Sequence, residues 1–325
     1  MLERLINISA PSAREHTLRE YIAKELEPVA EVSTDPMGNL IAHIPGDGKK
    51  LLLAAHMDEI GLMITFVDEK GFLRFAPIGG ITAPGICYHR IVLPSGREGV
   101  ISFPQNIKPE SLKLSDMFID IGATDSKDAE KYVSVGDMAT FQSHYYEDET
   151  RIVSGKLDDR LGCMLLLELA KKVKNPTCDL YLAFTVQEEI GLRGAAPATF
   201  GIEPYMAIAL DVTSTGDTPD SDTMAVSLGK GVAIKVKDGK MVAAEKVRTL
   251  LENICKEENL PYQLEVLSGG TTDSAAMQTA GIGTLAGAVS IPTRYIHTTS
   301  ETAAKADICA AGALLEKLVM RGELK

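Results

Sequence analysis

The feature that most constrains the fold of this chain is a set of short apolar segments, each followed closely by a residue that can bind a metal ion. The clearest are residues 51–55 before His56, residues 180–186 before Glu188 and Glu189, and residues 207–210 before Asp211. A continuous apolar run of this kind is typical of a strand that is buried on both faces. Open α/β sheets carry their functional groups at the carboxyl ends of such strands, so the pattern predicts an α/β sheet with a polar site at one edge.

The rest of the chain predicts helices and an insertion. We expect helices over residues 13–26, 161–173, 240–259 and 303–318. From residue 66 to 154, by contrast, short β-rich segments alternate with Gly, Pro, Asp and Ser turns, and long amphipathic helices are not predicted. We therefore predict a discontinuous catalytic α/β domain over residues 1–65 and 155–325, interrupted by a small β-barrel-like domain over residues 66–154.

Charge and cysteine content argue against several classes of protein. The net charge of −12 argues against nucleic acid or an acidic membrane surface as a partner, because both require a basic face. The five cysteines are scattered and contain no CxxC pair, which is typical of reduced thiols. The N-terminus does not resemble a signal peptide, and the apolar stretches are far shorter than a membrane span. We therefore expect a cytoplasmic protein without a membrane or nucleic-acid partner.

Two short segments contain candidate ligands that also have structural interpretations. His56 and Asp58 lie two residues apart, so in an extended segment both side chains point to the same side and can enter one site. Asp58 would then hold the imidazole in the right tautomer; the alternative is a buried histidine that an acid satisfies. In the Asp158-Asp159-Arg160 segment, one carboxylate could bridge two metals. Taken alone, this segment favours the alternative, an N-cap of the following helix.

The adjacent acids Glu188 and Glu189 follow a core strand and indicate a division of labour. One carboxylate would bind a metal, and its neighbour, pointing the other way, would take a proton from the attacking water. A charged surface loop is the alternative. Asp211 and His297, taken singly, also suit a helix cap or a satisfied core residue.

The whole set indicates a metal site more strongly than any single member does. Two histidines and several carboxylates, each from a different segment and without cysteine, suit zinc, cobalt or manganese. Closely spaced metals can share a bridging carboxylate. So many acids in one place would be prohibitively costly without cations to neutralise them.

Over nearly its whole length, the sequence resembles the glutamyl aminopeptidase and cellulase-M family, the tetrahedral (TET) aminopeptidases with two metal ions. The resemblance is carried, in family order, by Ala55–Gly61, Gly155–Gly162, Thr185–Ala195, Asp211–Thr213, Gly229–Gly231 and Thr293–His297. It implies a mixed-sheet, zinc-exopeptidase-like catalytic domain with three α/β/α layers. It also implies that the inserted domain mediates dimerisation and that dimers assemble into a hollow tetrahedron of twelve subunits.

The resemblance further implies a role for each candidate residue. One divalent ion would be held by His56, Asp211 and bridging Asp158, and the other by Asp158, Glu189 and His297. Zinc is the expected ion, with cobalt or manganese as alternatives. Glu188 would be the general base and then the proton donor to the leaving amine, and Asp58 would support His56. The expected reaction is removal of N-terminal residues from short peptides.

The sequence departs from the family pattern at two places. Thr298-Thr299 stand where the family has Ser-Pro, and residues 269–273 contain an extra Thr, both in loops expected to shape the substrate pocket.

The ligand spacing alone would equally permit a deacylase or a carboxypeptidase. A glycoside hydrolase is disfavoured because aromatic sugar platforms are scarce in a chain with no Trp and 5% aromatic residues. A non-catalytic binding protein is disfavoured because the full set of ligands is present together with Glu188.

Overall fold

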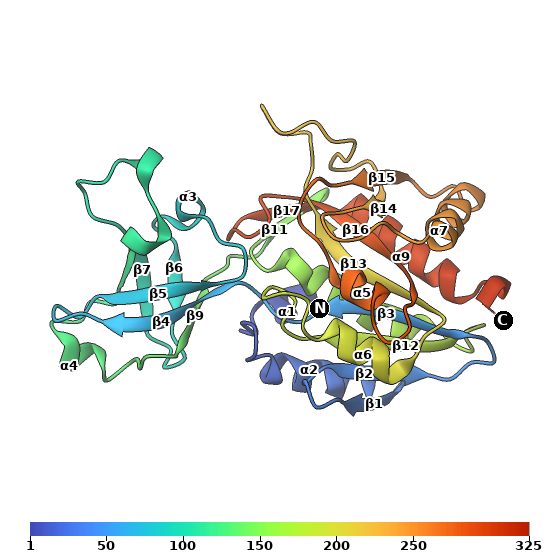
Figure 1. The fold of residues 1–325 in the computed structure, drawn as a ribbon, viewed down its shortest axis with the longest axis horizontal. Coiled ribbons are helices and arrows are strands. Elements are labelled where there is room, and N and C mark those ends of the chain that lie inside the picture. The colour runs from blue at the N-terminus through green and yellow to red at the C-terminus, as the bar shows by residue number, and fades with distance from the viewer. Residues whose placement is uncertain (325) are drawn as a thin grey trace.

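The computed structural model describes residues 1–324 and shows a large α/β body from which a small β-barrel projects (Figure 1). The body is built on an 11-stranded mixed sheet, and the projecting part is a closed barrel of six strands that pair antiparallel. These features confirm the predicted fold class.

The centre of the large sheet is parallel and contains the predicted apolar strands. Its four central strands are, in spatial order, β12 (Asp179–Thr185), β3 (Lys50–His56), β13 (Met206–Thr213) and β16 (Leu285–Arg294). The flanking strands are β1 (Glu31–Thr34), β2 (Leu40–Ile44), β17 (Glu301–Ala304), β11 (Arg151–Ser154), β10 (Tyr146–Glu147), β14 (Val232–Lys237) and β15 (Tyr262–Val266). Because β13 continues to Thr213, Asp211 lies within this strand rather than directly after it.

Both faces of the sheet are covered, which explains why its strands are apolar at consecutive positions. Leu51 and Leu53 of β3 join a core that includes residues of α5 (Leu157–Lys172) and α9 (Lys305–Val319). The alternate residues Leu52 and Ala54 join a second core with residues of α6 (Ala195–Ile202) and α8 (Asp273–Gln278). The body therefore has the predicted three layers, with helices on both sides of one sheet.

The predicted helices all occur, with shifted ends. The remaining helices are α1 (Leu2–Ile6), α2 (His16–Leu26), α3 (Ala83–Ile86), α4 (Ser126–Ala129) and α7 (Glu245–Glu257), with single 3-10 turns at Pro109–Ser111, Leu114–Asp116 and Gly322–Leu324. Helix α7 begins later than predicted because Oδ1 of Asp238 accepts hydrogen bonds from the amides of Lys240 and Met241, which holds that segment in a turn. Within residues 1–324, no helix is both long and apolar enough to cross a membrane.

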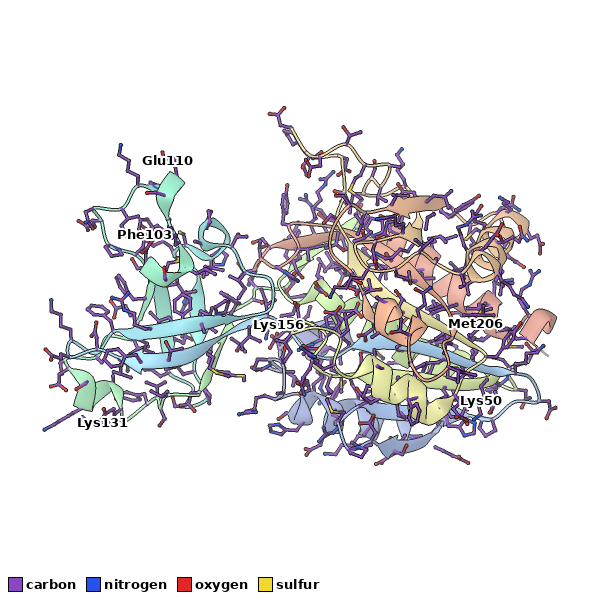
Figure 2. The ribbon with its side chains drawn as sticks, viewed as in Figure 1. Lys50, Phe103, Glu110, Lys131, Lys156 and Met206 are labelled. Atoms are coloured by element: carbon purple, nitrogen blue, oxygen red, sulfur yellow. The ribbon has the colours of Figure 1, made fainter. Side chains whose placement is uncertain are left out.

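The barrel has its own apolar interior. Its strands are β4 (Gly61–Val67), β5 (Leu73–Ile78), β6 (Arg90–Val92), β7 (Glu98–Ser102), β8 (Phe118–Asp120) and β9 (Met138–Phe141). Figure 2 shows Lys156 at the junction of barrel and body, where its Nζ lies 3.0 Å from Oε2 of buried Glu59. The strands β10 and β11 pair within the large sheet instead. The division of the chain into domains at residues 66 and 154 stays a prediction.

Leu53 tests the assignment of β3 to the core, because its side chain is fully buried. Leu53→Ala should lower the free energy of unfolding by about 2–5 kcal/mol, since it removes buried methyl groups and leaves a cavity. The control is Val266→Ala, at a β15 position whose residue is 58% exposed, and it should change that free energy by less than about 0.5 kcal/mol. Urea-induced unfolding at one protein concentration measures both variants. Equal losses for the two variants would contradict the assignment.

Candidate metal centre

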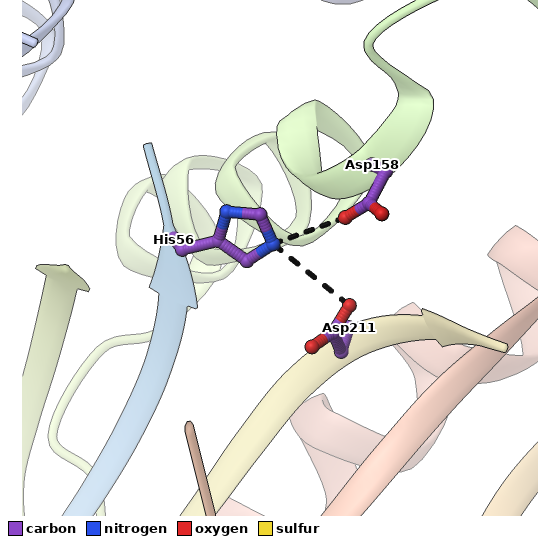
Figure 3. A group of neighbouring side chains, drawn as sticks. All are labelled: His56, Asp158 and Asp211. Atoms are coloured by element: carbon purple, nitrogen blue, oxygen red, sulfur yellow. Dashed lines mark hydrogen bonds and ion pairs between the residues drawn. The ribbon is translucent and has the colours of Figure 1, made fainter. Parts of the chain in front are cut away.

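The predicted ligands come from distant parts of the sequence and meet near the carboxyl ends of the central strands. His56 is the last residue of β3, Asp211 lies in β13, and Asp158 lies in the first turn of α5. Figure 3 shows one ring nitrogen of His56 directed at the side chains of both Asp158 and Asp211. Glu189 follows β12, and His297 lies in the loop between β16 and β17. The topology of the sheet therefore brings all five predicted ligands together.

His56, Asp158 and Asp211 form the first group of possible metal ligands, and all three are buried. The Nε2 atom of His56 lies 3.0 Å from Oδ1 of Asp158 and 3.9 Å from Oδ1 of Asp211. Ligand atoms that bind one zinc ion at about 2 Å lie roughly 3–4 Å from one another. The spacing of this group therefore suits a single cation.

Asp158, Glu189 and His297 form the second group. The Nε2 atom of His297 lies 3.3 Å from Oδ2 of Asp158 and 3.2 Å from Oε2 of Glu189. Asp158 thus belongs to both groups, and each of its two carboxylate oxygens faces a different histidine. This is the arrangement expected of a carboxylate that bridges two cations.

Main-chain carbonyls orient both histidine rings. Nδ1 of His56 lies 3.1 Å from the carbonyl oxygen of Asp58, and Nδ1 of His297 lies 2.7 Å from the carbonyl oxygen of Gly80. A carbonyl oxygen can only accept a hydrogen bond, so each Nδ1 carries a proton and donates it. Each Nε2 is then directed at the carboxylates and is the atom available to a metal ion.

The acids of the site are buried together, so each makes the ionisation of the others more costly. Burial, and after it the charge of Asp158, raises the pKa of Asp211 well above its usual range. Burial likewise raises the pKa of Glu188, and Asp211 raises it further, although His56 opposes both effects. Burial alone would lower the pKa of His297, but hydrogen bonds with Asp158 and Glu189 raise it to about 12. The cluster therefore favours positive charge between its acids, which divalent cations would supply.

A cleft of about 500 Å³ opens onto both groups of ligands. Glu188 lines this cleft together with His56 and His297, so it lies next to the space that a bound molecule would occupy. Apolar and small residues such as Leu192 and Gly191 line another part of the wall. The site thus combines an open volume, two groups of possible ligands and an additional acid.

The carboxylate of Asp58 holds the segment that contains Glu188 and Glu189. Oδ1 of Asp58 accepts a hydrogen bond from the amide of Glu188 at 2.9 Å, and Oδ2 accepts one from the amide of Glu189 at 3.2 Å. The hydroxyl of Ser12 donates to Oδ2 at 2.6 Å. Oδ1 of Asp58 also lies 3.5 Å from Nδ1 of His56. Asp58 therefore contacts the two neighbouring acids as well as the histidine that it was predicted to support.

The adjacent aspartates Asp158 and Asp159 have different surroundings. Asp158 faces the two histidines, whereas Oδ1 of Asp159 accepts a hydrogen bond from the amide of Gly162 at 3.0 Å, as a helix cap would. Both residues have non-helical backbone angles, so regular α5 begins after them. The capping alternative therefore describes Asp159, and the bridging alternative describes the position of Asp158.

Three contributors to the site were not singled out from the sequence. Gly80 has no side chain and therefore leaves no local signal in the sequence, although its carbonyl oxygen orients His297. Glu301 accepts hydrogen bonds from the main-chain amides of Asp158 and His297. Its place four residues after His297 is the only sequence signal. Asp273, within the threonine-rich segment, accepts a hydrogen bond of 2.5 Å from the hydroxyl of Thr185, the last residue of β12.

Histidines and carboxylates without cysteine, gathered in a cleft at the edge of a mixed α/β sheet, are typical of metal-dependent hydrolases. The model of the M42 glutamyl aminopeptidase family matches residues 38–314. The chain therefore belongs to the M42 glutamyl aminopeptidase family, and it is a hydrolase of the aminopeptidase class.

The same likeness extends to relatives over nearly the full length. The chain is 43% identical over 321 residues to a candidate aminopeptidase of Acetivibrio thermocellus, covering 98% of this chain and 97% of that protein. It is similar to the structure of an aminopeptidase from the archaeon Desulfurococcus kamchatkensis, with a TM-score of 0.94, 36% identity and coverage of 98% and 93%. It is also similar to the TET1 peptidase of Pyrococcus horikoshii, which assembles into a tetrahedron or an octahedral shell, with a TM-score of 0.89, 30% identity and 98% coverage of both chains. The predicted family, fold class and enzyme class are confirmed.

The shared position of Asp158 predicts how substitutions change metal content. Asp158→Ala should weaken the binding of the two expected cations by more than about 100-fold each, because each group of possible ligands loses a member. Even outer contacts to metal ligands contribute about 10–100-fold to affinity. His297→Ala should weaken the binding of one cation only. Elemental analysis after equilibrium dialysis against zinc gives the number of ions per chain. Asp159→Ala is the control and should keep both ions, whereas two ions retained in Asp158→Ala would contradict the bridging position.

Proposed function

We propose that this chain removes N-terminal residues from short peptides with the help of two divalent cations. His56, Asp158 and Asp211 would hold one cation, and Asp158, Glu189 and His297 the other. The observation that carries this proposal is the carboxylate of Asp158, whose oxygens lie 3.0 and 3.3 Å from the Nε2 atoms of the two histidines. Zinc is the proposed ion, with cobalt or manganese as alternatives, because nitrogen and oxygen ligands without cysteine suit all three.

The residues of the site fit such a pair of cations. The hydrogen bonds of both Nδ1 atoms leave the Nε2 atoms for binding, and the buried acids gain from positive charge. When bound, the two cations would polarise the carbonyl of a peptide bond and lower the pKa of water in the cleft.

Glu188 is the proposed general base and general acid. Glu188 lines the cleft, and burial raises the pKa of its carboxyl group above the usual range of a glutamate. A carboxylate with such a raised pKa can take a proton from the attacking water and pass it to the nitrogen that leaves. Asp58 accepts a hydrogen bond from the main-chain amide of Glu188 and so restricts where this carboxylate lies.

The charge of the cleft supports cleavage at the N-terminus. The acids around it favour a substrate end with a positive charge, which is the α-ammonium group of a peptide. The carboxylate end that a carboxypeptidase binds would meet these acids instead. Among the described residues that line the cleft, none is an aromatic side chain on which a sugar could stack, and this disfavours a glycoside hydrolase.

We further propose that the active form is a tetrahedral dodecamer of paired subunits in the cytoplasm, without a nucleic-acid or membrane partner. The support for assembly is the likeness to the TET1 peptidase, which forms a tetrahedron. The barrel, with its separate core and its position away from the body, is the proposed surface of dimerisation (Figure 1).

Glu188→Gln tests the proposed base. The amide cannot accept the proton, so kcat on aminoacyl-para-nitroanilides should fall by about 10²–10⁴-fold. Because Glu188 is not in either ligand group, the variant should keep the cations of the unchanged protein. Glu189→Gln is the contrasting variant and should lose affinity for one cation as well as activity. The measurements are steady-state hydrolysis and metal content of the same samples.

A panel of aminoacyl-para-nitroanilides, N-acylated substrates and substrates for C-terminal cleavage, assayed after chelation and after zinc or cobalt is added back, distinguishes the candidate functions. Activity that is lost on chelation, restored by zinc or cobalt and absent in Glu188→Gln supports the aminopeptidase. Turnover of N-acylated substrates or of C-terminal residues alone would replace it with a deacylase or a carboxypeptidase. A protein that binds both cations and turns over no substrate of the panel would contradict the proposed activity.

A further inference from the structure

The carboxylate of Glu301 joins the main chains of two proposed metal ligands. Glu301 is the first residue of β17, and 2% of its surface is exposed. Its Oε2 accepts a hydrogen bond from the amide of Asp158 at 3.1 Å. Its Oε1 accepts one from the amide of His297 at 2.9 Å. One side chain therefore connects positions that are 143 and 4 residues away in the sequence.

Both amides belong to backbone that regular secondary structure does not hold. Asp158 has φ −76° and ψ 109° at the irregular start of α5. His297 has φ +63°, a left-handed conformation that is unfavourable for a residue with a side chain. An acceptor outside the local backbone is therefore needed to satisfy these amides and to keep both residues in place.

The sheet brings Glu301 to this point. Strand β11 ends at Ser154, four residues before Asp158, and Ser154 pairs with Glu301 in the antiparallel ladder of β11 and β17. This pair is at the end of the ladder, next to the segments that contain Asp158 and His297. The side chain of Glu301 continues the connection beyond the last pair of strands.

We propose that Glu301 is a positioning residue that sets the relative placement of Asp158 and His297, and with it the affinity for the cations. This inference rests on the proposed metal centre. Both partners are N–H donors, and each oxygen of Glu301 accepts from a different one of them. A carboxylate supplies them with charge-assisted hydrogen bonds, whereas the amide of glutamine has one acceptor and one donor group.

Glu301→Gln tests this role with Co²⁺ as the probe. One of the two amides then faces an NH₂ group and loses its acceptor. We expect the unchanged protein to bind two Co²⁺ ions, and we expect the weaker-bound ion to dissociate about 10–100 times more readily in the variant, as for other groups that orient metal ligands. Competition with a chelator gives the affinities, and the visible absorption of Co²⁺ reports a changed geometry.

Asp307→Asn is the matched control. Asp307 is also fully buried, and its carboxylate also accepts hydrogen bonds from two main-chain amides, those of Gly229 and Gly231, both at 2.7 Å. It is in neither ligand group. This variant should lose thermal stability to a similar extent as Glu301→Gln and bind Co²⁺ within twofold of the unchanged protein.

The outcomes separate this inference from the proposed function. Unchanged affinity in Glu301→Gln, or an equal loss in Asp307→Asn, would overturn the positioning role while the metal centre stands. If the protein without any substitution binds no Co²⁺, both the positioning role and the proposed metal centre are overturned. If Glu301→Gln does not fold, Glu301→Asp is the second variant. It keeps the carboxylate, but its side chain is one methylene group shorter, so the carboxylate lies farther from the two amides. That variant should show the same weakening, and full affinity in it would equally overturn the role.

Discussion

The burial of several acids around one cleft is the constraint on which the rest of the site depends. Carboxylates are costly to remove from water unless positive charge or hydrogen-bond donors replace the solvent. Here the two histidines lie on either side of Asp158, and the ammonium group of Lys235 favours the charge of Asp211. Main-chain amides donate hydrogen bonds to the carboxylates of Asp58 and Glu301. Such an arrangement is stable when cations lie between the acids, which agrees with a metal-dependent peptidase of the M42 family.

Main-chain groups orient four side chains of the site. Asp58 and Glu301 each accept hydrogen bonds from two backbone amides, and His56 and His297 each donate to a backbone carbonyl. These backbone groups lie in loops or, at Asp158, at the irregular start of α5, so the hydrogen bonds themselves hold the segments that contain the ligands. The geometry of the ligands therefore follows the geometry of the sheet and of the loops at its edge.

The barrel takes part in this arrangement through the segment that follows β5. Gly79 has φ +83°, and a Cβ atom there would lie 2.9 Å from Oε2 of Glu189, so the position requires glycine both for its backbone and for the close approach. The next residue, Gly80, supplies the carbonyl that orients His297. A proposed surface of self-association and the proposed second cation are therefore connected by two consecutive residues.

The sequence by itself determined the central strands and the chemical kind of the site, because both follow from local patterns of polarity. His56 after five apolar residues is such a pattern, and the structure confirms the strand that it ends. Local patterns left open whether Asp158 caps a helix or faces the histidines. They also left out Glu301 and Gly80. These features follow from the pairing of β11 with β17 and from the place where the barrel meets the body. Only the tertiary structure decided them, because contacts between residues more than a hundred positions apart leave no periodic signal in either segment.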